Sequence, residues 1–228
     1  MAIILSIETA TPICSCALLS DGEVILNREN HYGQSHSALV GVFVHEIMDY
    51  VRQNNMKLDA IAISSGPGSY TGLRIGVSEA KGLSYGLDIP MIAIPTSYIM
   101  ASMMRDKLDK DTLLCSMIDA RRMEVYATIF DNSLNIIHNT SADIVDSNSY
   151  IDILDKNKVA FFGNGSEKCK EVITHQNAIF IEDIHPLASG MGALAEKAYK
   201  ENNFVDNAYF EPFYLKQFVA TVAKNKVF

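Results

Sequence analysis

The chain has 228 residues, 48% of them hydrophobic and 20% charged, and a formal net charge of −8. This length suits one large or two small domains, and the composition is that of a globular protein. The acidic balance argues against this chain being the main contact for a nucleic-acid backbone, which needs a basic face. Any functional link to RNA would therefore pass through another protein.

The cysteines and the N-terminal sequence argue against a disulfide-bonded, secreted or membrane protein. The four cysteines, none in a CxxC pair, fit small buried thiols in a reducing cytosol better than a metal or redox site; they are Cys14, Cys16, Cys115 and Cys169. The N-terminus lacks the basic segment of a signal peptide, and no apolar run is long enough to span a bilayer. We therefore expect a cytoplasmic protein that does not associate with membranes.

Alternating apolar runs and turn signals predict the first part of the chain. The dipeptide Asp21-Gly22 is a strong hairpin signal. We expect, in order, strands at 3–9, 13–19 and 23–30, a helix at 36–53, a strand at 60–64, a helix at 70–86, a strand at 91–94 and a helix from 96 to 104.

A charged run at 105–111 is the best candidate for a boundary between subdomains. Beyond it we expect strands at 112–118, 124–130, 136–144 and 159–162, a short helix ending at Leu154, helices at 167–174 and 187–200, and an extended arm at 210–215. These elements divide the chain into an N-terminal subdomain at 1–108, rejoined by roughly 187–215, and a smaller subdomain at 109–186. A basic C-terminal tail follows at 217–228.

A glycine-containing turn stands between a buried strand and a helix. It consists of Gly66, Pro67, Gly68, Ser69, Tyr70 and Thr71. The glycines permit positive φ, and Ser69 or Thr71 can cap the helix. A phosphate cradle would need GxxxxGK[ST] or GxGxxG, and a nucleophile elbow would need GxSxG. Neither pattern is present, so a tight turn that sets up a packed helix is favoured.

Both long helices carry more apolar or small surface than one core needs. The helix at 36–53 has two adjacent apolar stripes, and the helix at 70–86 has four glycines, each costing about 1 kcal/mol relative to alanine. One explanation is deep burial within a single domain; the other is a helix pair that also faces a partner. The candidate partner interface comprises Leu39, Val40, Phe43, Val44, Ile47, Met48, Val51, Gly72, Ile75, Gly76, Glu79, Leu83 and Gly86.

The motif SxGPGSYTGLRIGVSxAKGL, with ILSIETATPICSCALL near the chain start, resembles the signature of the TsaB family. The resemblance implies an α/β protein of the actin/Hsp70/sugar-kinase fold, with two subdomains that each have a mixed sheet flanked by helices. It also implies a non-catalytic subunit that binds TsaD through the two helices, or a second copy of itself when TsaD is absent, with the ATPase TsaE as third member. This assembly makes threonylcarbamoyladenosine (t6A) at position 37 of tRNA, which the chain would reach only indirectly.

The same resemblance points to a degenerate nucleotide site at Glu8, Gly163 and Gly165, with no cofactor bound by this chain alone and ATP or ADP possible in the complex. From the residues themselves, Glu8 is equally a strand-end carboxylate held by its turn, and the GNGS loop is equally a plain strand-to-helix turn. His31 and His36 are too far apart along the sequence for an HxxxH metal site. The alternatives to the accessory subunit are an autonomous M22-type metallopeptidase-like or nucleotide-binding enzyme, and a homodimeric scaffold acting alone.

Overall fold

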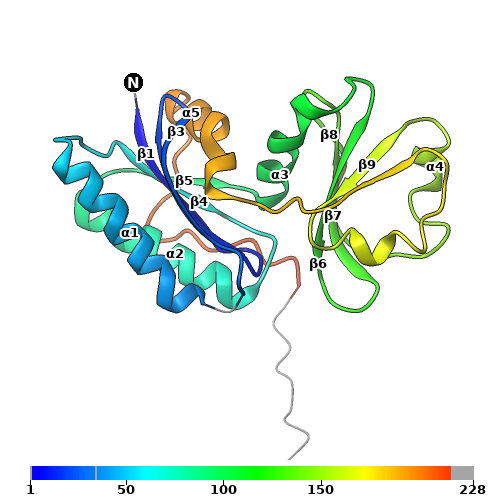
Figure 1. Cartoon of the computed structure of the whole chain (residues 1–228), viewed down its shortest axis with the longest axis horizontal. Helices are drawn as coiled ribbons and strands as arrows, with labels where there is room; N and C mark the ends of the chain where they lie inside the picture. Colours follow the sequence, from blue (N-terminus) through cyan, green and yellow to red (C-terminus); the bar gives the residue numbers. More distant parts are fainter. Residues whose placement is uncertain (1, 34, 217–228) are drawn as a thin grey trace, which may run out of the picture.

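A computed structural model describes residues 2–33 and 35–216 of the chain. In these ranges two five-stranded sheets lie side by side, each with helices packed on it (Figure 1). The first part comprises β1 (Ile3–Glu8), β2 (Cys14–Ser20), β3 (Glu23–Asn30), α1 (His36–Gln53), β4 (Ala60–Ser64), α2 (Tyr70–Leu87), β5 (Met91–Ile94) and α3 (Thr96–Met104). All eight elements were predicted, most of them within one residue of the observed bounds.

The second part departs further from prediction. It comprises η1 (Arg105–Lys107), β6 (Leu113–Asp119), β7 (Glu124–Phe130), β8 (Ile136–Ile144), α4 (Ile151–Leu154), β9 (Val159–Phe162), η2 (Glu167–Cys169), β10 (Ala178–Ile181), η3 (Ala188–Met191) and α5 (Gly192–Lys200). The predicted helix at 167–174 is wrong, because only the single 3₁₀ turn η2 forms there. Strand β10 was not predicted, and the helix at 187–200 begins as the 3₁₀ turn η3.

Both sheets have the same topology. The strand orders are β3-β2-β1-β4-β5 and β8-β7-β6-β9-β10. In the first sheet β1 to β3 are antiparallel and β4 and β5 continue parallel to β1. In the second sheet β6 to β8 and then β9 and β10 repeat this arrangement. This duplicated mixed sheet is the actin/Hsp70/sugar-kinase fold that the sequence resemblance implied.

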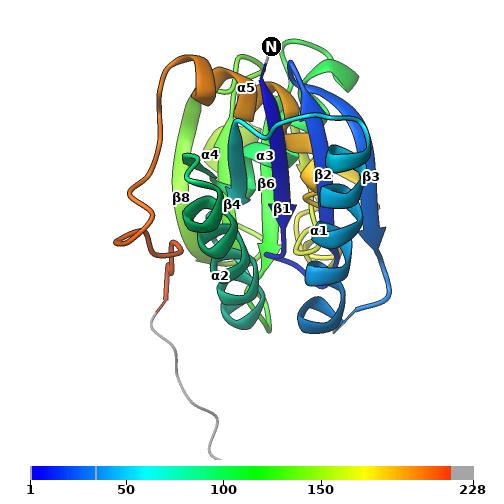
Figure 2. The same ribbon diagram turned by 90° about the vertical axis from the view of Figure 1, so that its left-hand side faces the viewer.

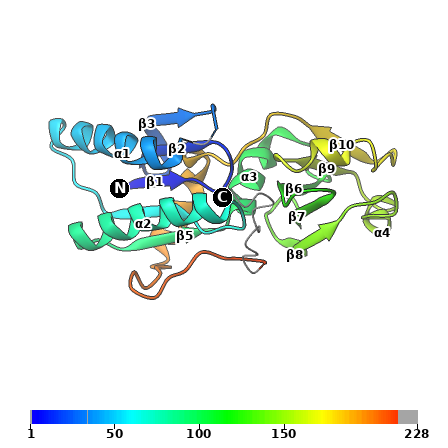
Figure 3. The same cartoon turned by 90° about the horizontal axis from the view of Figure 1, so that it is seen from below.

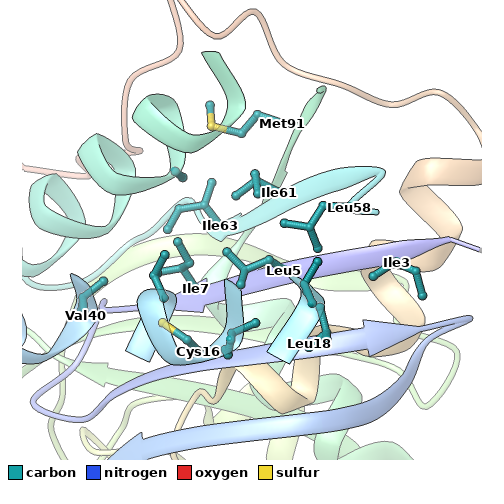
Figure 4. Packing of buried hydrophobic residues seen from close by; sticks show 14 of the residues in the cluster. Ile3, Leu5, Ile7, Cys16, Leu18, Val40, Leu58, Ile61, Ile63 and Met91 are labelled. Atoms are coloured by element: carbon teal, nitrogen blue, oxygen red, sulfur yellow. The ribbon is translucent and has the colours of Figure 1, made fainter. Parts of the chain in front are cut away.

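The first sheet is covered on both faces, which is why its central strands read as continuous apolar runs. Helices α1 and α2 run next to each other across one face (Figures 2 and 3). Between them and the sheet lies a core to which β1 contributes Ile3, Leu5 and Ile7 (Figure 4). On the opposite face η3 packs on β1 and β2, and α5 packs on β5 and β3.

Helix α3 lies between the two sheets and belongs to both cores. Ile99 packs with the first sheet. Met100, Ala101 and Met104, from the other side of the same helix, pack with the second sheet. The two sheets therefore share α3 as a buried element, so they pack on a common helix and are not simply joined by a linker.

An extended arm follows α5 and runs back along the first sheet. Val205 pairs with Met91 of the edge strand β5, and the arm then passes the outer flank of α2 (Figure 3). It ends at Lys216, whose ammonium pairs with Glu124 at the start of β7. The tail predicted at 217–228 lies outside the described residues.

Candidate functional site

The glycine turn before α2 is packed by the protein's own chain. Gly66, at φ +99°, would place a Cβ 2.7 Å from the carbonyl oxygen of Phe213, and a Cβ on Gly68 would lie 2.4 Å from that of Ala10. The peptide bond between Gly66 and Pro67 is cis. Ser69 caps α2, because its hydroxyl accepts a hydrogen bond from the Gly72 amide at 3.2 Å. The turn is thus the tight, helix-initiating turn that the spacing favoured.

The four glycines of α2 fall into two groups. A Cβ on Gly72 would lie 2.1 Å from the Thr9 carbonyl oxygen, and one on Gly76 would lie 2.3 Å from the Thr9 hydroxyl. Gly82 and Gly86 have no atom within 4 Å of the Cβ position. The prediction that Gly72 and Gly76 face a partner is therefore wrong, since both are buried and their small size is required by the loop after β1.

One stripe of α1 is also unavailable to a partner. Val40, Val44, Ile47 and Val51 are all buried in the core between α1 and the sheet. The apolar strands β1 and β2 already cover this stripe, so its assignment to a partner interface is wrong. Sequence periodicity gave the right stripe but the wrong neighbour for it.

A long-range ion pair shows how the rest of α1 is oriented. Glu46 pairs with Arg28 of β3, and residues three or four positions apart share a helix face. Leu39 and Phe43 therefore lie on the flank over β3, where they pack against the edge of the core. The opposite flank of α1, which includes Met48, faces α2. Leu39 and Phe43 are thus half-buried on the β3 side of α1 and do not face the groove between the helices.

What remains is a surface that we call the α1–α2 face. It is formed by Gly41 and Met48 of α1 and by Ile75, Glu79, Gly82, Leu83 and Gly86 of α2. A Cβ on Gly41 would meet nothing within 4 Å among the described residues. Apolar side chains with intervening glycines make a surface that another helix can approach closely.

A second feature is a cleft of about 800 Å³ between the two sheets. It is lined by the loop after β1, the N-terminal ends of α1 and α2, the turn after β6, Asn164 and the end of the arm. Arg121 lines it from the second sheet, and both Arg121 and Arg122 have positive φ, at 72° and 49°. Thr11 is among the lining residues; it is only 2% exposed, and its hydroxyl is buried without a hydrogen-bond partner among the described residues.

The repeated fold places an acidic residue at the end of β1 and at the end of β6. Glu8 is fully buried, accepts a hydrogen bond from the Ala10 amide and does not line the cleft. Burial raises the pKa of Glu8 to about 8, against the opposing effect of that amide. Asp119 instead lines the cleft, pairs with Lys168 and accepts from the Arg121 amide at 3.1 Å. Glu8 is thus a buried strand-end carboxyl held by its own turn, whereas Asp119 faces the cleft.

The other two predicted nucleotide-site residues have structural roles. A Cβ on Gly163 would lie 2.2 Å from the Met117 carbonyl oxygen, and one on Gly165 would lie 2.8 Å from the Ile118 carbonyl carbon. Neither glycine lines the cleft, whereas Asn164 between them does. The assignment of Glu8, Gly163 and Gly165 to a degenerate nucleotide site stays a prediction. Pro67 to Thr71 of the predicted turn and Asn164 of the GNGS loop do line the cleft, whereas the end of the arm was not assigned to any site from the sequence.

No complete catalytic group occurs in the part of the chain that the structure describes. There, no three His, Cys, Asp or Glu side chains gather as metal ligands. His36 bonds the Thr11 carbonyl at 2.8 Å, and all four cysteines are buried. Ser141 lies 2.9 Å from His138, but its hydroxyl donates to Asp143 at 2.6 Å, which is not the hydrogen-bond order of a catalytic triad.

Within residues 2–33 and 35–216 we find no helix with the length and apolarity needed to cross a bilayer. Comparison with known proteins gives one family: a family model described as TsaD, tRNA N6-adenosine threonylcarbamoyltransferase, matches residues 24–224.

Curated relatives are named tRNA threonylcarbamoyladenosine biosynthesis protein TsaB. The chain is 32% identical to that of Bacillus subtilis over 61% of its own length and 60% of the relative's. It is 38% identical to that of Escherichia coli over 54% and 52%. The matches thus span about half to three-fifths of these relatives. YeaZ from Pseudomonas aeruginosa has the same fold, with a TM-score of 0.79 at 24% identity over 94% of this chain and 100% of that one. The family model shows that the chain belongs to the family described as TsaD, and within it the chain's curated relatives and its fold are those of the TsaB (YeaZ) proteins.

Proposed function

We propose that this protein is a non-catalytic subunit in the synthesis of t6A at position 37 of tRNAs that read ANN codons. In this proposal it docks through the α1–α2 face on TsaD and holds TsaD in its active form. TsaD then transfers the threonylcarbamoyl group from threonylcarbamoyl-AMP to N6 of the adenosine, and TsaE is the third member. The names of the TsaB relatives and the TsaD family model support the pathway.

The single observation that supports docking is the α1–α2 face. Gly41, Gly82 and Gly86 interrupt helices at positions where an added Cβ would have no neighbour within 4 Å among residues 2–33 and 35–216. Each costs the helix about 1 kcal/mol relative to alanine. Because packing within this described part of the chain does not require these glycines, close approach of a partner helix explains them best.

An accessory role also agrees with charge. At a net charge of −8 the chain is a poor direct ligand for tRNA. The complex would bring it to tRNA indirectly and would act in the cytoplasm. An autonomous M22-type peptidase would need a metal site or a nucleophile with its base, and the described residues do not bring such a set together. The accessory role is therefore the better supported of the two proposals.

The test is a matched pair of aspartates on α2, assayed for binding to purified TsaD of the same organism. Ile75→Asp puts a charge in the α1–α2 face, whereas Ser78→Asp puts the same charge on an exposed position outside it. We expect Ile75→Asp to weaken binding at least about tenfold, equivalent to about 1.4 kcal/mol, with an unchanged circular dichroism spectrum. Ser78→Asp should bind as wild type does. Equal affinity of all three proteins would refute docking through this face.

The cleft favours a second candidate, binding of ATP or ADP. The N-terminal turn of α2 and Arg121 both line the cleft, and both can interact with an anionic ligand. Calorimetric titration with ATP, for the chain alone and with TsaD, tests this candidate. Loss of the signal in Arg121→Ala supports the cleft as the site, and an unchanged signal contradicts it.

A further inference from the structure

One charged residue lies within the otherwise apolar α1–α2 face. Glu79 is half-buried on α2, one helical turn after Ile75 and one turn before Leu83. Its carboxylate is among the groups that, after burial and Cys14, raise the pKa of the Cys16 thiol of β2. Ile75 and Leu83, four positions away on either side, pack against the core that α1 and α2 share, so helical spacing places Glu79 on the flank of α2 that faces α1.

The described residues provide no cation for Glu79. No hydrogen bond or ion pair involves it in residues 2–33 and 35–216. Two basic residues of α1, His45 and Arg52, both contact the carboxylate of Asp49 on the same helix. The α1–α2 face therefore carries an uncompensated negative charge.

The cations of α2 itself are on the wrong flank. Arg74 donates to the Tyr214 hydroxyl at 3.2 Å, and Lys81 donates to the Ala208 carbonyl at 3.2 Å. Both contacts are with the C-terminal arm, which passes α2 on the side away from α1 (Figure 3). The arm thus holds these two charges away from the α1–α2 face.

The position of Glu79 matters for symmetry. It lies near the midpoint of the 18-residue helix α2. A two-fold interface uses the same patch on both copies, so an axis through the middle of the α1–α2 face brings the two Glu79 carboxylates close together. Like charges brought together in an interface cost several kcal/mol. Self-association through this face is thereby penalised, whereas a partner with a cation at the matching position is not.

We propose that Glu79 determines which partner the α1–α2 face accepts: it favours a helix pair that carries a lysine or arginine opposite it, and it disfavours a second copy of this chain. The inference rests on the proposed docking function and adds a rule of selection to it. Such charge pairs contribute more to the choice of partner than to raw affinity.

The test measures two equilibria for each variant. Glu79→Gln removes the charge and keeps the shape, and Glu171→Gln makes the same change at an exposed position on the second sheet's side. Self-association is measured by analytical ultracentrifugation, and binding to TsaD by calorimetry. We expect Glu79→Gln to tighten self-association about tenfold and to weaken binding to TsaD about tenfold. Salt should tighten self-association of the wild type but not of Glu79→Gln, because only the wild type has a repulsion to screen.

The outcomes separate this inference from the function on which it rests. Opposite shifts of the two equilibria in Glu79→Gln, with no shift in Glu171→Gln, support it. Shifts in the same direction, or no shift in either equilibrium, overturn it. If Ile75→Asp abolishes TsaD binding while Glu79→Gln leaves both equilibria unchanged, docking stands and the selection rule alone fails. If wild-type protein does not bind TsaD, the proposed function fails as well.

Discussion

Two glycines in the same helix should respond to alanine in opposite directions. At Gly72 an added Cβ would lie 2.1 Å from the Thr9 carbonyl oxygen, which is a backbone atom, whereas at Gly82 it would meet nothing within 4 Å. Both positions are helical, so alanine is compatible with the backbone at each. The pair isolates the effect of packing against the loop after β1 from helix propensity.

The magnitudes follow from these contacts. To reach ordinary contact, the Thr9 carbonyl would have to move more than about 1 Å, and overpacking of this kind costs about 1–3 kcal/mol. Alanine returns about 1 kcal/mol of helix propensity. Gly72→Ala should therefore lose up to about 2 kcal/mol, and Gly82→Ala should gain up to about 1 kcal/mol. The two variants then differ by about 1–3 kcal/mol, and for a chain of this size their melting temperatures should differ by roughly 2–12 °C.

Urea titration followed by circular dichroism at 222 nm measures both free energies of unfolding, with Gly86→Ala as a second open-site control. Stabilisation by Gly72→Ala, or equal shifts in Gly72→Ala and Gly82→Ala, would refute the packing argument. Because Gly82 belongs to the α1–α2 face, Gly82→Ala should also weaken TsaD binding while it stabilises the free protein. That combination distinguishes a glycine kept for a partner from one kept for the fold.

Three further predictions concern buried and bridging groups. The carboxyl of Glu8 has a pKa near 4.5 in the unfolded chain and about 8 in the folded protein. Between these pH values the free energy of unfolding should therefore fall by up to about 1.4 kcal/mol per pH unit. Denaturation of Glu8→Gln should lack this slope, and an equal slope in both proteins would show that Glu8 is ionised in the fold. The native protein should expose no thiol to Ellman's reagent at pH 8, because burial of the cysteines also raises their pKa; a fast-reacting equivalent would contradict this burial. Lys216→Ala should change the free energy of unfolding by no more than about 0.5 kcal/mol, because the ion pair of Lys216 with Glu124 is partly exposed. The same variant should make the arm more sensitive to protease. An unchanged cleavage rate would mean that this pair does not hold the arm.

Much of the fold was predictable from local signals. Strand β4 and helix α2 were predicted within one residue because an apolar run, a glycine turn and a serine cap stand in sequence there. The predicted helix at 167–174 was wrong. Cys169 and Ile173 have the four-residue spacing of a helix, but only the 3₁₀ turn Glu167–Cys169 forms in this segment. Strand β10 was not predicted because it is only four residues long and is partly buried at a sheet edge.

The site was less predictable, for a physical reason. Gly72 and Gly82 look alike in a helical pattern, and only the three-dimensional path of the loop after β1 separates them. In the same way, the flank of α1 that contains Phe43 was assigned to a partner because nothing local reveals the pairing of Arg28 with Glu46. Periodicity identifies which residues share a stripe, but the neighbour that covers the stripe is a long-range property.

The route of the chain through the first sheet has a consequence for its synthesis. The face of this sheet opposite α1 and α2 is closed by Ala188, Met191 and Ala195, which pack over Ile4 and Ile92. When the ribosome has completed β1 to β5, those covering residues do not yet exist, whereas the second sheet is contiguous and can fold before η3 emerges. A nascent chain therefore carries an uncovered β surface until nearly all of it has been translated, and messages truncated before α5 should yield insoluble product.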